Sequence, residues 1–221
     1  MFLSRLSLSR SPDVAALGQL LNPDHDGARM DAHHRLIWAA FAGDPDAARE
    51  FLWRDLGDGR FLVLSARPPA MSPLFEPPEV QGFAPDLRVG DRLSVLLRAN
   101  ATRTVSDDDG RKKHRDVVME ALHPVAKADR AEARSEAAQA AGSAWLAGQG
   151  TRAGFTCDAV TVGGYRVVQA PGRGVRRPRF GVIDLEADIT LTDPPAFLAR
   201  LATGFGRAKA FGCGLMLIRR A

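Results

Sequence analysis

The sequence predicts an α+β protein made of two ferredoxin-like (βαββαβ) domains in tandem. Two observations support this fold class. Alternating apolar residues, typical of half-buried strands, flank one amphipathic helix in the chain up to Ala66, and a similar order of patterns begins again near Val89. A proline-rich stretch, Pro68–Pro85, separates the two sets. We therefore expect an N-terminal domain at residues 1–85 and a C-terminal domain at residues 86–221.

The composition limits the classes of protein to consider. The chain has 221 residues and a formal net charge of +4, with acidic residues nearly as numerous as basic ones. This length allows one large or two small hydrophobic cores, and the charge is compatible with an anionic partner. Cys157 and Cys213 form neither a metal-type spacing nor a disulfide framework. No stretch has the length of a membrane span or the core of a signal peptide, so we expect a cytoplasmic protein.

The N-terminal domain is predicted to begin with a strand, Phe2–Ser9, in which phenylalanine and leucine alternate with serine and arginine. An amphipathic helix is expected at Arg29–Ala42. The segments Glu50–Asp55 and Arg60–Ala66 flank an Asp-Gly turn and predict a β-hairpin. These elements supply most of one ferredoxin-like unit, and Pro68–Pro85 is expected to be an irregular connection.

Two adjacent histidines, His33 and His34, lie on the predicted helix. The apolar face of this helix is defined by Leu36, Ile37, Ala40 and Phe41. At about 100° per residue, His33 projects near the middle of this face, whereas His34 lies on its flank. Position therefore favours a buried His33 with its polar atoms satisfied and a more accessible His34. Because histidine titrates near pH ~6.5, either is a candidate general acid or base.

The C-terminal domain is predicted to begin with a strand and hairpin over Val89–Thr104. The hairpin tip, residues 106–115, carries three aspartates followed by basic residues that include Lys112 and Lys113. A charged tip is usually only solvated. Its basic half also suits an RNA stem, because A-form RNA is read largely through phosphates, 2′-hydroxyls and shape.

An alanine-rich helix is expected at Asp129–Ala147, ended by two glycines. The segments Phe155–Val162 and Tyr165–Gln169 are expected to pair around a Gly-Gly turn, and Phe180–Leu191 predicts a long strand. Residues 172–179 crowd four arginines among glycine and proline. Such a basic loop is either a clamp for a nucleic-acid backbone or simply a surface loop.

The most strongly patterned stretch ends the sequence. An amphipathic helix, Pro195–Thr203, leads into a loop that contains Arg207 and Lys209, and an apolar strand, Cys213–Ile218, follows. The glycines of the loop are Gly204, Gly206, Gly212 and Gly214. Glycine lets a backbone approach a ligand, so we expect consecutive amides and two cations to face a phosphate. A Walker loop and a dinucleotide fingerprint are excluded, because their glycines precede a helix; a glycine C-cap followed by a turn is the alternative.

The segment GFGRAKAFGCGL in this loop resembles the glycine-rich signature of the CasE family. Members of this family are CRISPR RNA-processing endoribonucleases of the Cascade surveillance complex, within the wider repeat-associated RNA-binding superfamily. HHRLIWAAF, RLSVLLRANATR and AWLAGQGTRAGF occur here in the same order as in the family, and the resemblance covers nearly the whole chain. It implies, as partners, the CRISPR repeat hairpin in precursor and mature crRNA and the other Cascade subunits. It implies no cofactor.

The resemblance also implies site residues. It favours His34 as the catalytic histidine, with His33 as the second candidate, because the family has a histidine four residues before a Trp or similar residue and seven before a Phe. Many relatives have a tyrosine where this chain has Asp31, so His33 or Arg29 would have to replace its hydroxyl. From the resemblance and the basic segments together, the candidate RNA-binding residues are Arg29, Arg98, Arg103, Lys112, Lys113, Arg173, Arg176, Arg177, Arg207 and Lys209, while Asn100 is expected to be structural.

The expected reaction needs no metal. The RNA 2′-hydroxyl attacks the adjacent phosphorus and leaves a 2′,3′-cyclic phosphate and a 5′-hydroxyl. A catalytically inactive crRNA-binding subunit of Cascade is the alternative, and an unrelated nucleotide-binding enzyme is a third hypothesis. His25-Asp26 resembles the core of an HD phosphohydrolase, but its separate upstream histidine and downstream aspartate are not evident. Asp107–Asp109 resembles no two-metal site.

Overall fold

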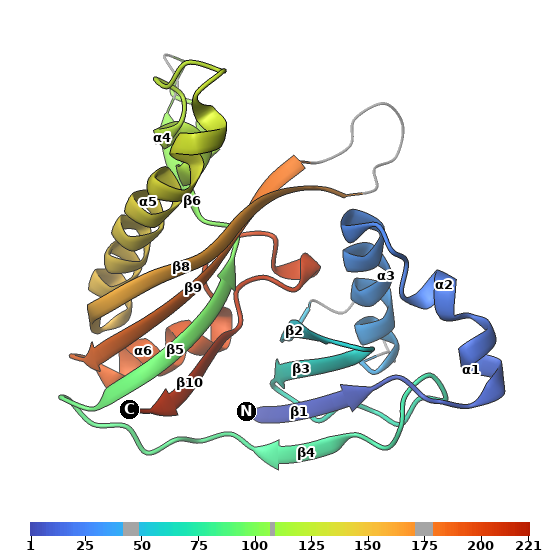
Figure 1. Cartoon of the computed structure of the whole chain (residues 1–221). Coiled ribbons are helices and arrows are strands. Elements are labelled where there is room, and N and C mark those ends of the chain that lie inside the picture. The colour runs from blue at the N-terminus through green and yellow to red at the C-terminus, as the bar shows by residue number, and fades with distance from the viewer. Residues whose placement is uncertain (42–48, 107–108, 171–178) are drawn as a thin grey trace.

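The computed structural model describes residues 1–41, 49–106, 109–170 and 179–221. Two four-stranded antiparallel sheets, one from each half of the chain, lie side by side, and a separate two-stranded hairpin extends from the second half (Figure 1). The predicted α+β class and the tandem ferredoxin-like fold are confirmed. None of the helices in these ranges is both long and apolar enough to cross a membrane.

The N-terminal sheet has the strand order β2-β3-β1-β4, which is the ferredoxin-like order. Its strands are β1 (Phe2–Ser7), β2 (Phe51–Gly57), β3 (Arg60–Ser65) and β4 (Glu79–Gly82). Two short helices, α1 (Pro12–Ala16) and α2 (Gly18–Leu21), lead into α3 (Asp26–Ala39), which packs on one face of the sheet. The predicted β-hairpin is confirmed, because β2 and β3 pair antiparallel on either side of the Asp58-Gly59 turn.

The proline-rich stretch contains a strand that the sequence did not predict. β4 pairs with β1 from Phe2 opposite Gly82 to Arg5 opposite Glu79. Between β3 and β4 the chain holds five prolines and forms no helix, so the first unit lacks the second helix of the βαββαβ pattern. Proline removes a helical hydrogen-bond donor and clashes with the preceding turn. It is tolerated directly before a short edge strand such as β4.

The C-terminal sheet has the strand order β10-β5-β9-β8 and completes the βαββαβ pattern. Its elements are β5 (Arg92–Ala99), α5 (Arg130–Ala153), β8 (Phe155–Gln169), β9 (Arg179–Leu191), α6 (Pro194–Thr203) and β10 (Met216–Arg220). The hairpin of β6 (Thr102–Ser106) and β7 (Lys112–Asp116), followed by the short α4 (Val117–Ala121), is inserted between β5 and α5. A 3₁₀ turn, η1 (Lys209–Phe211), lies in the glycine-rich loop.

The expected strand pair around Gly163-Gly164 is wrong. Residues 155–169 form one continuous strand, β8, which pairs along its length with β9. The register shifts between Val162 and Gly164, so the two glycines mark a β-bulge and not a turn.

The predicted end of the alanine-rich helix is also wrong. Helix α5 continues past Gly148 and Gly150 and ends at Gly154, whose φ of 72° is a left-handed C-cap. Gly150 is needed for close packing, because a Cβ there would lie 2.4 Å from the Phe155 carbonyl oxygen. Gly150 therefore allows a close packing contact and does not end the helix.

The described residues form three hydrophobic clusters, of which the two larger ones are the main cores. One lies between α3 and the N-terminal sheet and includes Ile37, Trp53 and Phe61. The larger core lies in the C-terminal half, and Leu52 and Leu64 of the N-terminal sheet belong to it. The two halves are thus joined by a shared apolar contact. The division at residues 85 and 86 lies in the segment between β4 and β5 and stays a prediction.

Candidate functional site

Four glycines set the path of the loop that joins α6 to β10. All four have positive φ, between 71° and 95°, a conformation that other residues rarely adopt. A Cβ at Gly206 would lie 2.6 Å from the Asn100 carbonyl oxygen, and one at Gly212 would lie 3.0 Å from the Trp53 ring. The glycines are therefore required by the backbone conformation and by close packing against both halves of the molecule.

Backbone amides of this loop bind carbonyl groups of the protein itself. The N–H of Arg207 donates to the Asn100 carbonyl (3.1 Å). The N–H of Gly214 donates to the Arg98 carbonyl (2.7 Å). The expectation that consecutive amides face a phosphate is therefore wrong at these positions. The loop instead offers the side chains of Arg207, which is exposed, and Lys209, which is partly buried.

The same loop contacts helix α3 of the other half through η1 (Figure 1). The ring centroid of Phe211 lies 6.3 Å from that of His34, and Phe211 stacks on Phe180 at 5.3 Å. Lys209 Nζ donates to the Thr203 carbonyl (2.6 Å). His34 and the glycine-rich loop therefore meet in space, although His34 and Gly204, the first glycine of the loop, are 170 residues apart in the chain.

His34 is partly buried, as its position on the helix predicted. Its Nδ1 is buried and has no hydrogen-bond partner among the described residues. Burial lowers the pKa of His34 below its ordinary value, Arg49 and Arg35 lower it further, and Asp31 opposes them. The imidazole is therefore largely neutral near pH 7 and free to accept a proton, which suits a general base.

His33 is 1% exposed and lies in the N-terminal core, as expected from the sequence. Its Nε2 lies 3.1 Å from Asn22 Oδ1, and its Nδ1 lies 3.3 Å from Asp55 Oδ2. The ring packs edge-on against Phe61 with centroids 4.7 Å apart. These contacts give His33 a structural environment, and a catalytic role for it is untested.

Arg49 is a site residue that the sequence analysis missed. Its Nε is buried without a hydrogen-bond partner among the described residues, and burial lowers its pKa. Arg49 and Thr203 line one cavity of about 440 Å³. The positive charge of Arg49 lowers the pKa of both His34 and Lys209. For Lys209, burial is the larger cause. Nothing in the local sequence marked Arg49, because it lies between elements, before β2.

A groove of about 890 Å³ opens on the other side of the glycine-rich loop. It lies between the β6–β7 hairpin with α4 and the pair of α5 and the loop. Basic side chains from four segments line it: Arg103, His114, Arg152, Arg200 and Arg207. Arg103 and Arg207 were predicted as RNA-binding residues. Arg152 and Arg200 were missed, because each lies within a helix and outside the clusters of basic residues that the sequence shows. A groove with this charge suits a phosphate backbone.

Other predicted RNA-binding residues lie elsewhere. Arg98 is partly buried, and its guanidinium binds both carboxylate oxygens of Asp184 (2.8 and 3.2 Å), away from the groove. Arg29 pairs with Asp26 and donates to the Asp24 carbonyl (3.1 Å). The expected basic tip is exposed, with Lys112 and Lys113 on β7; Arg173, Arg176 and Arg177 lie outside the described residues.

Asn100 has the structural environment expected for it. It is 5% exposed, and its Nδ2 donates to the Gly181 carbonyl (2.8 Å). In the described ranges no group of three or more His, Cys, Asp or Glu side chains is arranged to hold a metal ion.

Comparison with known proteins gives a family model, a curated relative and two solved structures that are related to one another. The model of the family described as CRISPR associated protein matches residues 1–220. The CRISPR system Cascade subunit CasE of Escherichia coli K12 is 28% identical over 188 residues, which cover 83% of this chain and 88% of that protein. The crystal structure of the CRISPR-associated protein Cas6e from E. coli K-12 is similar over 100% of both chains (TM-score 0.63, 20% identity). Thermus thermophilus Cse3 bound to an RNA representing a pre-cleavage complex is similar over 99% of this chain and 98% of that one (TM-score 0.66, 22% identity).

Proposed function

Because this chain belongs to the CRISPR-associated protein family, we propose that it is an endoribonuclease that cuts CRISPR repeat hairpins in precursor crRNA. Two relatives support this assignment: the Cascade subunit CasE, and Cse3, which a second similar structure names as a CRISPR endoribonuclease bound to a 19-nucleotide RNA. The observation that carries it is the meeting of His34 with the glycine-rich loop, whose opposite side lines the basic groove.

The groove receives the RNA stem. Among the described residues, four arginines line it: Arg103 on the β6–β7 hairpin, Arg152 on α5, Arg200 on α6 and Arg207 on the loop. Such contacts go to phosphates, so they set affinity and position and carry little base specificity. The base of the stem then lies at the loop, next to His34.

Cleavage uses the nucleophile that RNA already contains. The 2′-oxygen attacks the adjacent phosphorus as its proton passes to a base, and the bond from phosphorus to the 5′-oxygen breaks as that oxygen gains a proton. The products are a 2′,3′-cyclic phosphate and a 5′-hydroxyl. His34 accepts the 2′-hydroxyl proton, since its lowered pKa keeps the imidazole neutral near pH 7. The reaction needs no metal.

Arg49 and Lys209 supply positive charge beside His34. The Arg49 guanidinium carries a buried Nε that has no hydrogen-bond partner in the part of the chain that the structure describes, and an unpaired buried donor is costly unless a ligand binds it. A phosphorane oxygen is such a ligand. Positive groups placed before the reaction stabilise charge that develops in the transition state, often the largest single catalytic contribution.

After cleavage the protein stays bound to the mature crRNA as a subunit of Cascade. The groove contacts the stem and not the bond that is broken, so its contacts persist in the product. The enzyme then turns over slowly, and single-turnover kinetics are the appropriate measure of its chemistry.

The test is single-turnover cleavage of an end-labelled repeat hairpin from the host's own CRISPR array, in EDTA. We expect wild type to cut it and leave a 2′,3′-cyclic phosphate. His34→Ala should lose cutting and keep hairpin affinity, whereas Arg49→Ala should slow cutting with a smaller effect on binding. His123→Ala is the matched control, because His123 is an exposed histidine in the loop after α4.

Each other outcome points to a different function. Tight hairpin binding without cutting would favour an inactive crRNA-binding subunit, for which Asp31 in place of the family tyrosine is the motivating observation. Cutting only with added metal would refute the proposed mechanism. Affinity for a free nucleotide and none for the hairpin would refute the whole assignment.

A further inference from the structure

The first turn of helix α3 is in close backbone contact with strand β8 of the other half of the molecule. A Cβ at Gly27 would lie 1.9 Å from the Gln169 carbonyl oxygen and 2.8 Å from its carbon. Real Cβ atoms do not approach a backbone oxygen this closely, so no other residue fits at position 27 without moving the helix. The position of α3, and with it that of His34, therefore depends on the C-terminal sheet.

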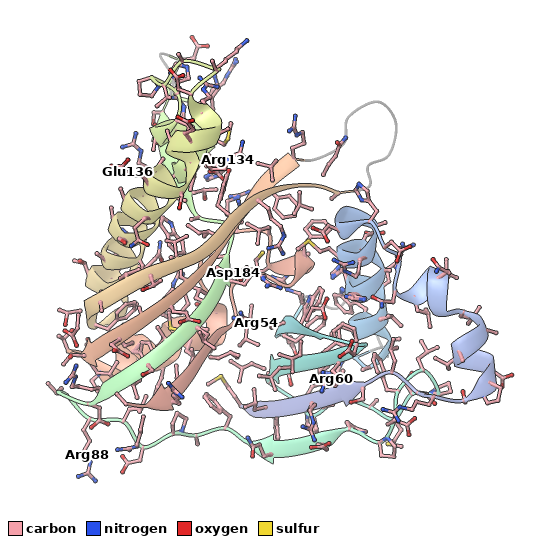
Figure 2. All side chains as sticks on the ribbon, viewed as in Figure 1. Arg54, Arg60, Arg88, Arg134, Glu136 and Asp184 are labelled. Carbon is pink, nitrogen blue, oxygen red and sulfur yellow. The ribbon has the colours of Figure 1, made fainter. Side chains whose placement is uncertain are left out.

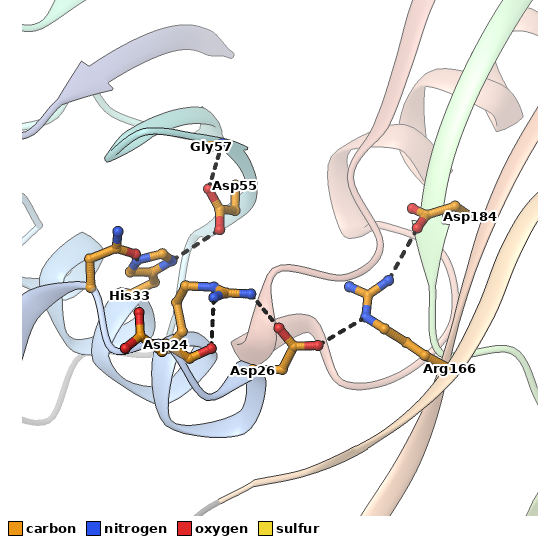
Figure 3. A network of polar contacts seen from close by, with 9 residues as sticks. Asp24, Asp26, His33, Asp55, Gly57, Arg166 and Asp184 are labelled. Carbon is orange, nitrogen blue, oxygen red and sulfur yellow. Dashed lines mark hydrogen bonds and ion pairs between the residues drawn. The ribbon is translucent and has the colours of Figure 1, made fainter.

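A chain of ion pairs ties the same helix end to that sheet (Figure 3). Arg166 on β8 lies between two carboxylates: its Nε is 3.5 Å from Asp26 Oδ2 on α3, and its Nη1 is 3.4 Å from Asp184 Oδ2 on β9. All three side chains are partly exposed, so we expect each pair to act mainly by fixing geometry and only weakly by its energy.

Asp184 is a shared anchor for both halves. Besides Arg166 it binds Arg98 of β5 at 2.8 Å, and Arg54 of β2 lies 3.8 Å away (Figure 2). The Arg98 backbone carbonyl in turn accepts the hydrogen bond from Gly214 of the glycine-rich loop. One set of contacts thus holds the end of α3 and the loop that His34 faces.

From this geometry we infer that Arg166 is a positioning residue for cleavage, which holds α3 so that His34 lies against the glycine-rich loop. The inference rests on the proposed function for its kinetic consequence. Arg166 acts through Asp26 and Asp184 and is not among the residues that line the basic groove. Because a displacement of about 1 Å can cost on the order of 100-fold in rate, loss of the tie should slow cleavage and leave hairpin affinity nearly unchanged.

The first experiment measures single-turnover rates and hairpin Kd values for Arg166→Gln, Asp26→Asn and the double variant. We expect each single variant to cut about 10- to 100-fold more slowly, with Kd within about twofold of wild type. The double variant should be no slower than the slower single one, because both remove the same tie. Arg92→Gln is the matched control: its ion pair with Asp158 is also exposed, at 3.8 Å, but joins strands of the C-terminal sheet alone.

The variant Asp26→Asn separates positioning from direct RNA contact. This variant removes a negative charge and keeps Arg166. If Arg166 contacted the RNA directly, the Asp26→Asn protein would bind the hairpin as well as wild type or better, and it would cut at an undiminished rate. Slower cutting by Asp26→Asn supports the inference. Undiminished cutting by Asp26→Asn, or a large loss of affinity in Arg166→Gln, overturns it.

A second measurement does not depend on activity. Titration of the His34 ring by NMR should show a higher pKa in Arg166→Gln than in wild type, because α3 moves away from the loop and His34 loses part of its burial. The charged groups that face His34, namely Asp31, Arg35 and Arg49, are unchanged in this variant. An identical titration in both proteins overturns the inference. If wild type does not cut the hairpin while the titration shifts, the proposed function fails and the positional role stands.

Discussion

Replacing Gly206 by alanine tests the geometry of the glycine-rich loop. Gly206 has a φ of 71°, and a Cβ there would lie 2.6 Å from the Asn100 carbonyl oxygen. This oxygen is the one that accepts the Arg207 N–H, so the methyl group and that hydrogen bond compete for the same place. The loop has to move away from the end of β5.

The expected cost follows from two contributions. A left-handed conformation costs an L-residue about 1–2 kcal/mol. Weakening the hydrogen bond between Arg207 and Asn100 costs about 1 kcal/mol. We therefore expect Gly206→Ala to lower the free energy of unfolding by about 2–3 kcal/mol. Hairpin affinity should fall as well, because Arg207 lines the groove.

Urea unfolding followed by tryptophan fluorescence measures this loss, and two glycines provide graded controls. Gly90 has a φ of 88° and open space around its Cα, so Gly90→Ala should cost only the conformational part, about 1–2 kcal/mol. Gly18 lies in α2 with open space and no positive φ, so Gly18→Ala should cost nothing. If Gly206→Ala costs no more than Gly90→Ala and leaves hairpin Kd unchanged, the reasoning from contact distances is refuted.

Three further predictions follow from local contacts. Glu120 forms an ion pair with Arg103 at 2.6 Å in the groove. Glu120→Gln should therefore tighten hairpin binding and steepen the slope of log K against log[salt] by about 0.7–0.9, and weaker binding would contradict this. Burial raises the pKa of Cys213 to about 12, so its thiol should resist alkylation at pH 8 until the protein unfolds; rapid labelling of Cys213 in folded protein, as distinct from the partly exposed Cys157, would contradict this. Burial alone would raise the pKa of Asp55, but the contact with His33 Nδ1 at 3.3 Å and the hydrogen bond from the Gly57 N–H prevail and lower it. Its stabilising contribution should therefore be complete above pH ~4 and disappear as pH falls further, so the stability difference between wild type and Asp55→Asn should shrink there; a constant difference from pH 7 to 3 would exclude this role.

Local patterns in the sequence predicted much of the fold. The helix with both histidines, the β2–β3 hairpin and the final helix, loop and strand were all expected within a few residues of their observed positions. β4 was missed because four exposed residues have no apolar alternation, and it forms only where β1 offers a free edge. β8 was divided at a glycine pair because a β-bulge and a turn share the same residues, and only the pairing with β9 distinguishes them.

The candidate site was less predictable than the fold. His34 could be singled out because its burial follows from the helical period and its spacing resembles a known family. Arg49 and Arg166 could not, since each acquires its neighbours from elements far away in the chain. The same holds for Asp184, whose three arginine neighbours come from β2, β5 and β8. Long-range strand register creates such sets, and no local pattern encodes it.

The placement of Leu52 and Leu64 in the larger core affects how the protein can be divided for study. A fragment that ends at residue 85 would expose both leucines, and the complementary fragment would lose part of the cover over its own interior. Trp53 would likewise be separated from Gly212, on which its ring rests. Although each half has its own sheet, we expect neither to behave well when expressed alone. Co-expression of the two fragments, followed by a test of whether they reassociate, is the more informative design.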